Sequence, residues 1–353
     1  MVTQGYNRYR GRGGGHKGLL VAVLVLILLA AVAFLVSQRY LVYDESGAAH
    51  WELPIFRRDA SDPGQPEKEN PISPEDVVIE REEPEPVKEE PAPQLQPERP
   101  KLKELHAAEL ENGALWWNTE YVLSEVEEDM MVEVKRAGGG ITYGTEVSTP
   151  SGVVVERGVT RDNLATLLQS DHYSVARISC FRDTSYAEGE PDTALKATWG
   201  DVWYDGDGRA WLDPSNEDAA AYLTAICREC AALGFDELLL DGFCYPTSGD
   251  REALALPEEL DRTAALKAFA GALREALPET VALSVAYRGD MGALGGESGL
   301  TAELLGSFDR IYVDSSVDRE ALEKALPETF DRAGGLVLLC YERPESGGYV
   351  IMP

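Results

Sequence analysis

The chain has 353 residues, of which 44% are apolar, and its formal net charge is -30 at pH 7. This length and composition allow one large domain or two ordinary ones with a sizeable core. Nucleic-acid binding depends on clustered Lys and Arg, so the large carboxylate excess excludes a nucleic-acid partner from our expectations.

A basic tail, residues 1–18, precedes the run LLVAVLVLILLAAVAFLV at 19–36. At about 1.5 Å per residue, a helix of this length crosses the hydrocarbon core of a bilayer. The alternative is a cleaved signal peptide, but no A-x-A-like site follows the run. Basic residues gather before it rather than after it: Arg8, Arg10, Arg12 and Lys17 against Arg39. We therefore expect one transmembrane helix at 19–38, an N-terminus in the cytoplasm and an extracytoplasmic remainder at the cell membrane.

Proline and glutamate dominate the next part of the chain, as in PEKENPISPEDVV and REEPEPVKEEPAPQLQPERP. Such a composition buries too little apolar surface to fold. We predict a disordered extracytoplasmic linker at 39–104, which leaves residues 105–353 as the globular domain.

Short apolar runs then alternate with helical patterns. Strands are predicted at 115–123, 130–135, 174–181, 237–243, 281–287, 309–314 and 335–341, with a candidate eighth at 349–353. Helices are predicted at 160–170, 217–233, 258–277 and 319–326. This alternation indicates an α/β domain of the (β/α)8 TIM-barrel type, with its last units truncated. The alternative is an open Rossmann-like sheet, although no G-x-G-x-x-G follows a first strand.

Cysteine and histidine offer little chemistry. The five cysteines are an odd number, which argues against a full disulfide framework outside the cytoplasm. Cys227 and Cys230 form a C-x-x-C inside a helical pattern, and we interpret them as buried small apolar residues. The sequence contains no G-x-S-x-G motif, and no histidine lies at a predicted strand end. We therefore expect no Ser-His triad, no metal and no cofactor.

Charged residues lie at the carboxyl ends of several predicted strands, where barrel enzymes carry their active sites. The alternation of side chains assigns five of them to one cluster in the barrel mouth: Glu133, Lys135, Arg177, Asp241 and Asp314. Two carboxylates in one cleft suit glycosidic cleavage, and tryptophans and tyrosines in the long loop at 181–211 would stack on sugar rings. The alternative is that Asp241 and Arg177 form only a structural ion pair.

Three motifs occur in order along the domain: YSVARISCFRD, GDVWYDGDGRAWLDPSN and AAAYLTAICRECAALGFDELLLDGFCYP. With them the chain resembles a family of glycoside hydrolase-like barrel domains in bacterial envelope proteins, a domain-of-unknown-function group (DUF4015-like) related to α-amylase-like barrels. The resemblance covers 133–246 well and the last third weakly. It implies a TIM barrel and glycoside hydrolase activity.

By this resemblance Asp241 matches the acid of the fourth strand, and Glu133 to Lys135 match a motif of the second. Other matched positions are Arg177, Phe181, Asp183, Trp211, Asp213, Pro214, Asn216 and Tyr245. The chain departs from the family at Ala286, where an acid is expected, and the candidates to replace that acid are Asp290, Asp314 and Glu342.

These patterns predict a membrane-anchored extracytoplasmic glycoside hydrolase-like protein acting on an envelope or environmental polysaccharide. Asp241 is the expected nucleophile or base, and Asp314 the expected acid. The expected substrate-binding residues are Glu133, Lys135, Arg177, Asp183, Trp203, Trp211, Asp213, Tyr245 and Arg288. The alternative is a non-catalytic barrel that binds glycan or a protein partner. A second carboxyl within about 5–10 Å of Asp241 would favour hydrolysis.

Overall fold

The computed structural model describes residues 41–43, 49–51, 102–155, 158–289, 292 and 294–353. The chain divides into two compact units, Met1–Glu89 and Glu90–Pro353. In the first unit, β1 (Leu41–Tyr43) pairs with β2 (Ala49–Trp51) in an antiparallel hairpin. This hairpin lies within residues 39–104, so the prediction of a disordered linker is wrong for these two strands, which precede the Pro- and Glu-rich part.

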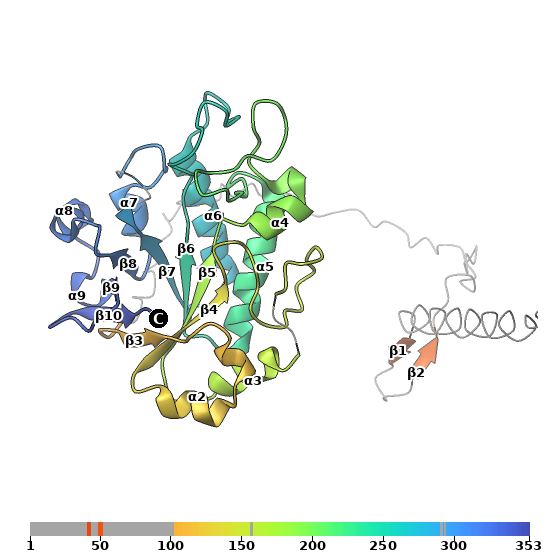
Figure 1. Cartoon of the computed structure of the whole chain (residues 1–353), viewed down its shortest axis with the longest axis vertical. Coiled ribbons are helices and arrows are strands. Elements are labelled where there is room, and N and C mark those ends of the chain that lie inside the picture. The colour runs from red at the N-terminus through yellow and green to blue at the C-terminus, as the bar shows by residue number, and fades with distance from the viewer. Residues whose placement is uncertain (1–40, 44–48, 52–101, 156–157, 290–291, 293) are drawn as a thin grey trace, which may run out of the picture. The chain divides into compact units, whose positions relative to one another are not determined.

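The second unit contains a closed barrel of eight parallel strands, so the predicted TIM-barrel fold is confirmed and the open sheet is excluded (Figure 1). The order around the ring is β10-β3-β4-β5-β6-β7-β8-β9. The strands are β3 (His106–Glu109), β4 (Asp129–Lys135), β5 (Ser174–Ser179), β6 (Glu237–Asp241), β7 (Ala282–Tyr287), β8 (Ile311–Asp314), β9 (Leu336–Cys340) and β10 (Gly348–Ile351). The candidate eighth strand is therefore real, and it pairs with β3 and closes the ring.

The first strand was predicted in the wrong place. Residues 115–123 form no strand, but contribute to the 3-10 turn η2 (Ala114–Trp116) and the helix α2 (Thr119–Glu125). Asn118 decides this locally, because its side-chain oxygen accepts a hydrogen bond from the Tyr121 N–H at 3.0 Å and caps the helix. The barrel begins instead at β3, whose alanine-rich sequence HAAE carries little β-propensity.

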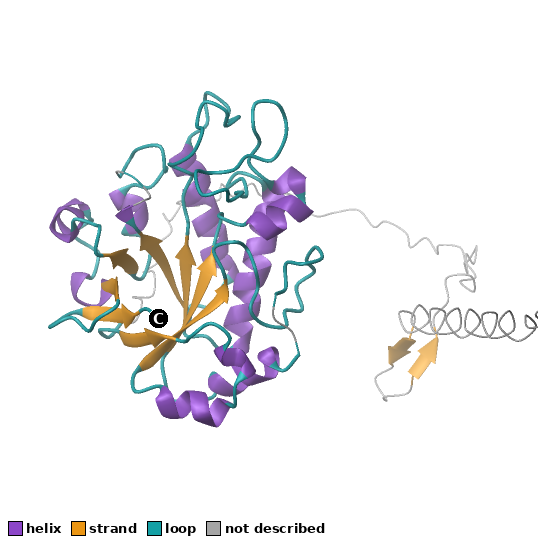
Figure 2. Ribbon diagram, in the orientation of Figure 1, coloured by secondary structure: helices purple, strands orange, loops and turns teal. Residues whose placement is uncertain are grey.

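Helices pack around the barrel, as Figure 2 shows. They are α3 (Thr160–Leu167), α4 (Thr184–Gly189), α5 (Glu217–Leu233), α6 (Arg262–Ala276), α7 (Ala302–Leu305), α8 (Arg319–Ala325) and α9 (Arg332–Gly335), with a 3-10 turn η3 (Pro191–Thr193). The predicted helix at 217–233 is confirmed as α5, which Asn216 caps and which Gly234 ends in the left-handed region at φ 112°. No helix joins β9 to β10, so the last unit is shortened as expected.

Two layers of apolar side chains hold the barrel together. One lies between strands and helices and includes four buried cysteines, all five cysteines of the chain being free thiols. The other fills the barrel interior with Leu105, Ala107, Met131, Val175, Leu239, Ala286, Tyr312, Val337, Leu339 and Val350. At the amino-terminal end of the strands Glu237 pairs with Arg310 and accepts hydrogen bonds from Ser284 at 2.6 Å and Tyr312 at 2.8 Å. This buried polar group closes that end of the barrel.

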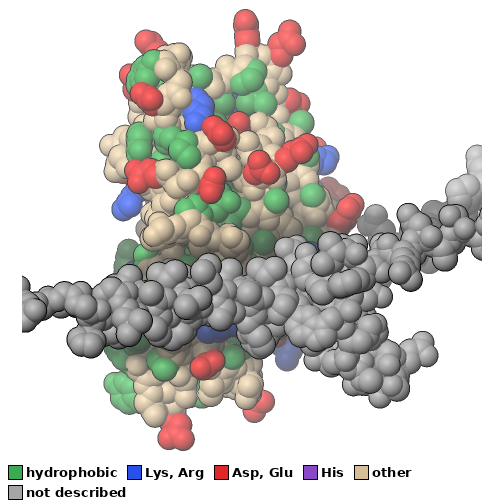
Figure 3. Space-filling view, turned by 90° about the vertical axis from the view of Figure 1, so that its right-hand side faces the viewer, with side chains coloured by type: hydrophobic (Ala, Val, Ile, Leu, Met, Phe, Trp, Pro, Cys, Tyr) green, Lys and Arg blue, Asp and Glu red, His purple; other side chains and the backbone are tan. Residues whose placement is uncertain are grey.

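The predicted transmembrane helix at 19–38 lies outside the described residues, as do the basic tail and most of the linker. Within the part of the chain that is described, no helix combines the length and hydropathy needed to cross a membrane. Acidic side chains are scattered over the face drawn in Figure 3, and basic ones are sparser.

Candidate active site

A layer of charged side chains lies directly above the apolar filling of the barrel. Each member follows an interior residue of its own strand by two positions: Glu109 after Ala107, Glu133 after Met131, Arg177 after Val175, Asp241 after Leu239, Arg288 after Ala286 and Asp314 after Tyr312. Because side chains alternate along a strand, all six residues lie on the interior face of the barrel, near the carboxyl ends of their strands.

Arg177 of β5 gathers three carboxylates around one guanidinium. Its Nε donates to Glu109 Oε1 at 2.6 Å and its Nη2 to Glu133 Oε1 at 2.7 Å. Its Nη1 donates to Asp241 Oδ2 at 3.3 Å. Since the three acids share one planar group, any two of these carboxylates lie within about 10 Å, the range that glycoside hydrolases use.

Asp241, at the end of β6, is held by two arginines. Besides Arg177, Arg288 donates from Nη2 to Oδ2 at 2.6 Å and from Nε to Oδ1 at 3.2 Å. Both oxygens therefore accept charge-assisted hydrogen bonds, which orient the carboxylate. The structure thus brings together Glu133, Arg177 and Asp241, three of the five residues predicted to form the cluster, and adds Arg288, which was expected only to bind substrate.

Glu109 belongs to this cluster and was not predicted. The misplaced first strand concealed it, although the alternation in HAAE would have put Ala107 and Glu109 on one face once β3 was recognised. Its side chain is only 2% exposed. Burial raises the pKa of this carboxyl above its ordinary value, Arg177 opposes the rise, and Glu133 and Asp241 add to it. Burial lowers the pKa of Arg177, but its three carboxylates together raise it overall.

Lys135 and Asp183 lie elsewhere, and their assignment to the cluster in the mouth and to substrate binding is corrected. A register shift between Glu133 and Lys135 turns the lysine away from the face that Glu133 occupies. Its Nζ lies 2.7 Å from Asp183 Oδ2, with both side chains fully buried, and donates to the Ser179 carbonyl at 2.6 Å. Neither side chain can touch a sugar there. They form a structural ion pair instead.

The aromatic residues chosen for sugar contact are mostly buried. Trp203 and Trp211 are 3% and 6% exposed, and Tyr245 is fully enclosed. Trp203 Nε1 donates to the Asp250 carbonyl at 2.8 Å, and Trp211 Nε1 to Asp205 Oδ2 at 2.9 Å. These side chains therefore hold the loops above the strands together. Their buried rings offer little surface on which a sugar could stack.

Two aromatic side chains of the same loop are exposed: Trp199, with an exposed fraction of 68%, and Tyr204, with 41%.

Asp213 lies in the turn before α5, where its Oδ1 accepts a hydrogen bond from the Ser215 N–H at 2.8 Å. The motif of Asp205 and Asp207 is a turn as predicted, with Arg182 bound to both carboxylates.

Asp314 lies at the end of β8 and accepts hydrogen bonds from Ser316. Its Oδ1 accepts from the Ser316 N–H at 3.0 Å and also from the Ser316 hydroxyl. Among the contacts of the described residues, none joins Asp314 to the Arg177 cluster, so its role as the acid stays a prediction. Asp290, which could also replace the acid expected at Ala286, lies outside the described residues, and Glu342 is exposed on the loop after β9.

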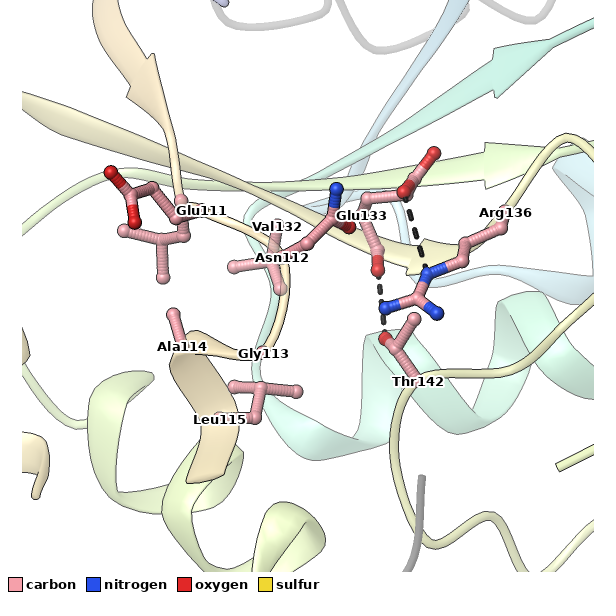
Figure 4. A pocket seen from close by; sticks show the side chains of 10 residues that line it. Glu111, Asn112, Gly113, Ala114, Leu115, Val132, Glu133, Arg136 and Thr142 are labelled. Carbon is pink, nitrogen blue, oxygen red and sulfur yellow. Dashed lines mark hydrogen bonds and ion pairs between the residues drawn. The ribbon is translucent and has the colours of Figure 1, made fainter. Parts of the chain in front are cut away.

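A hollow of about 20 Å³ lies beside the cluster (Figure 4). Glu133 and Arg136 form its charged side, 3.9 Å apart, and the Thr142 hydroxyl donates to the Glu133 carbonyl at 2.7 Å. This volume suits about one water molecule rather than a sugar ring. In the described part of the chain, no three His, Cys, Asp or Glu side chains are arranged to hold a metal ion.

Comparison with known proteins gives one family and several distant structures. The model of the DUF4015 family, described as "Putative glycosyl hydrolase domain", matches residues 120–295. No curated protein matches the chain at a significant level.

Among solved structures, the chain is similar to a hypothetical protein from Ruminiclostridium thermocellum, at 23% identity and a TM-score of 0.41, covering 50% of this chain and 96% of that one. It is also similar to an alpha-galactosidase from Thermus thermophilus, at 18% identity and a TM-score of 0.35, covering 52% of this chain and 38% of that one. An alpha-galactosidase from Geobacillus stearothermophilus is similar at 10% identity and a TM-score of 0.44, and the match covers 71% of this chain and 39% of that one. The chain thus spans well under half of either galactosidase. Similarity this low assigns no substrate and no catalytic residue.

Proposed function

Because residues 120–295 belong to the family described as "Putative glycosyl hydrolase domain", we propose that the barrel hydrolyses glycosidic bonds at its carboxyl-terminal end. One observation carries the proposal. Asp241 lies at the end of the fourth barrel strand, in one cluster with further carboxyls held by the same guanidinium. Glycoside hydrolases need such a pair of carboxyl groups at the scissile bond.

Asp241 acts as the nucleophile or base of this reaction. A carboxylate in that role has to keep one orientation, and the hydrogen bonds from Arg177 and Arg288 hold it in place. The substrate we propose is a polysaccharide of the cell envelope or the environment.

Asp241→Asn tests this role in the full chain. We expect the variant to lose at least about 10²-fold in the rate of glycan cleavage, because the amide can neither attack nor take a proton. Reducing-end release from a panel of glycans is the measurement, and Glu120→Gln, an exposed acid on α2, is the matched control. Circular dichroism verifies folding. Unchanged product release in Asp241→Asn would remove Asp241 from the reaction.

A non-catalytic glycan-binding barrel is the second candidate. It is favoured by the two arginines that cover Asp241. Calorimetric titration with the same glycans separates the two functions. Binding by the wild-type protein without any cleavage selects this candidate.

We also propose that the segment at 19–38 anchors the protein in the cell membrane, with the N-terminus in the cytoplasm and the barrel outside. The uninterrupted apolar run and the basic residues before it support this placement. The Pro- and Glu-rich linker would then hold the barrel away from the bilayer, within reach of envelope glycans.

A further inference from the structure

Glu109 has an unusual set of contacts within the charged layer. Its Oε1 accepts from Arg177, whereas its Oε2 is buried and has no hydrogen-bond partner among the described residues. A buried carboxylate oxygen without a donor is costly, since the ionised form needs hydrogen bonds on both oxygens. The neutral carboxylic acid costs less to bury at this position than the charged carboxylate does.

The neighbouring acids differ in this respect. Both oxygens of Asp241 accept from arginines. In Glu133, Oε1 accepts from Arg177 and Oε2 lies 3.9 Å from Arg136 Nε. Each of these two carboxyls therefore faces two guanidinium groups, while Glu109 faces only one. Pairs of carboxyls in such unequal surroundings are the usual source of one acid and one base.

We propose that Glu109 is the proton donor of the site, giving the proton on Oε2 to the glycosidic oxygen while Asp241 acts at the anomeric carbon. This rests on the proposed hydrolase function. The bond between the anomeric carbon and the glycosidic oxygen breaks, and the leaving oxygen departs with the Glu109 proton as an alcohol. One water molecule then supplies the hydroxyl at the anomeric carbon and the proton that restores Glu109, so no further reactant is required.

The electrostatics of the layer act in the same direction. Burial raises the pKa of Glu109, and two neighbouring carboxylates reinforce it. A general acid works best when it holds its proton near the working pH. Asp314, the donor expected from the sequence, is instead a hydrogen-bond acceptor for Ser316 in a turn.

Leaving-group dependence in the full chain tests the proposal. Glu109→Gln keeps the size of the side chain and an oxygen for Arg177, but cannot give up a proton. We expect a loss of about 10²–10⁴-fold on a glycan or alkyl glycoside and less than about 10-fold on the matching dinitrophenyl glycoside, which needs no protonation. The alkaline limb of the pH profile of kcat/KM should also disappear. Equal losses on both substrates, or this pattern in Asp314→Asn instead, would overturn the assignment.

A second measurement does not depend on activity. Side-chain ¹³C-carboxyl NMR of glutamate-labelled protein should show one carboxyl that titrates above the ordinary range and is missing in Glu109→Gln. If Glu109 titrates normally, the proposal fails even when the protein cleaves glycans. If the Glu109 carboxyl titrates above the ordinary range but the wild-type protein cleaves no glycan, the proposed hydrolase function is wrong, and the role of Glu109 as its proton donor is wrong as well.

Discussion

Arg177 shows what single residues decide in this barrel. Its guanidinium satisfies three acids at once, and these acids come from strands that are far apart in the chain. Removing Arg177 would leave several partly buried carboxylates without compensation, which costs more than the pair itself contributes. The cluster held by Arg177 includes the proposed catalytic Asp241.

The raised pKa of Glu109 makes stability depend on pH. The unfolded chain releases this proton near the ordinary pKa of 4.5, whereas the folded protein keeps it to higher pH. Between the two pKa values the folded state binds more protons, so the free energy of unfolding falls as pH rises. Glu109→Gln removes the effect. In urea denaturation, the stability of the variant relative to wild type should therefore increase from about pH 4 to about pH 7. A constant or decreasing difference would contradict this expectation.

Between elements, the buried pair of Lys135 and Asp183 joins the end of β4 to the start of α4. Asp183 also caps α4 by accepting from the Tyr186 N–H at 2.8 Å. The pair therefore fixes the loop after β5 with respect to the barrel. Its place outside the barrel interior explains why both residues occur in the motifs without reaching the candidate site.

Breaking this pair should destabilise the protein strongly. We expect Lys135→Met to lower the free energy of unfolding by about 3–5 kcal/mol, because Asp183 then loses its cationic partner while it stays buried. The double variant Lys135→Met/Asp183→Asn should regain part of the loss, since the asparagine keeps the cap without the charge. Lys267→Met, which breaks an exposed pair with Glu303, should change stability by less than about 1 kcal/mol. Denaturant unfolding of all three variants measures this. No recovery in the double variant would argue against an uncompensated charge.

On the scale of the whole molecule, the chain combines an acidic barrel with the proposed anchor at 19–38. The net charge of -30 disfavours binding to nucleic acids and to anionic lipid surfaces. Attachment to a membrane would therefore depend on the apolar segment rather than on the barrel surface.

Membrane fractionation tests this attachment. The full chain should remain in the membrane pellet after alkaline carbonate extraction, because a spanning helix resists extraction that releases peripheral proteins. A variant without residues 1–38 should appear in the soluble fraction with the same circular dichroism of the barrel. Release of the full chain into the supernatant would exclude an integral anchor.

Much of this architecture follows from local patterns. Seven of the eight barrel strands, together with α5 and its cap, are evident from alternation, helical periodicity and turn residues. The same period of two places Glu133, Arg177, Asp241 and Asp314 on the interior face, and it wrongly adds Lys135. What only the tertiary structure decided is the weak first strand with Glu109, the register shift at Lys135 and the burial of Trp203 and Trp211. The physical reason is that ring closure and strand pairing impose these features from distant parts of the chain, and no local pattern encodes them.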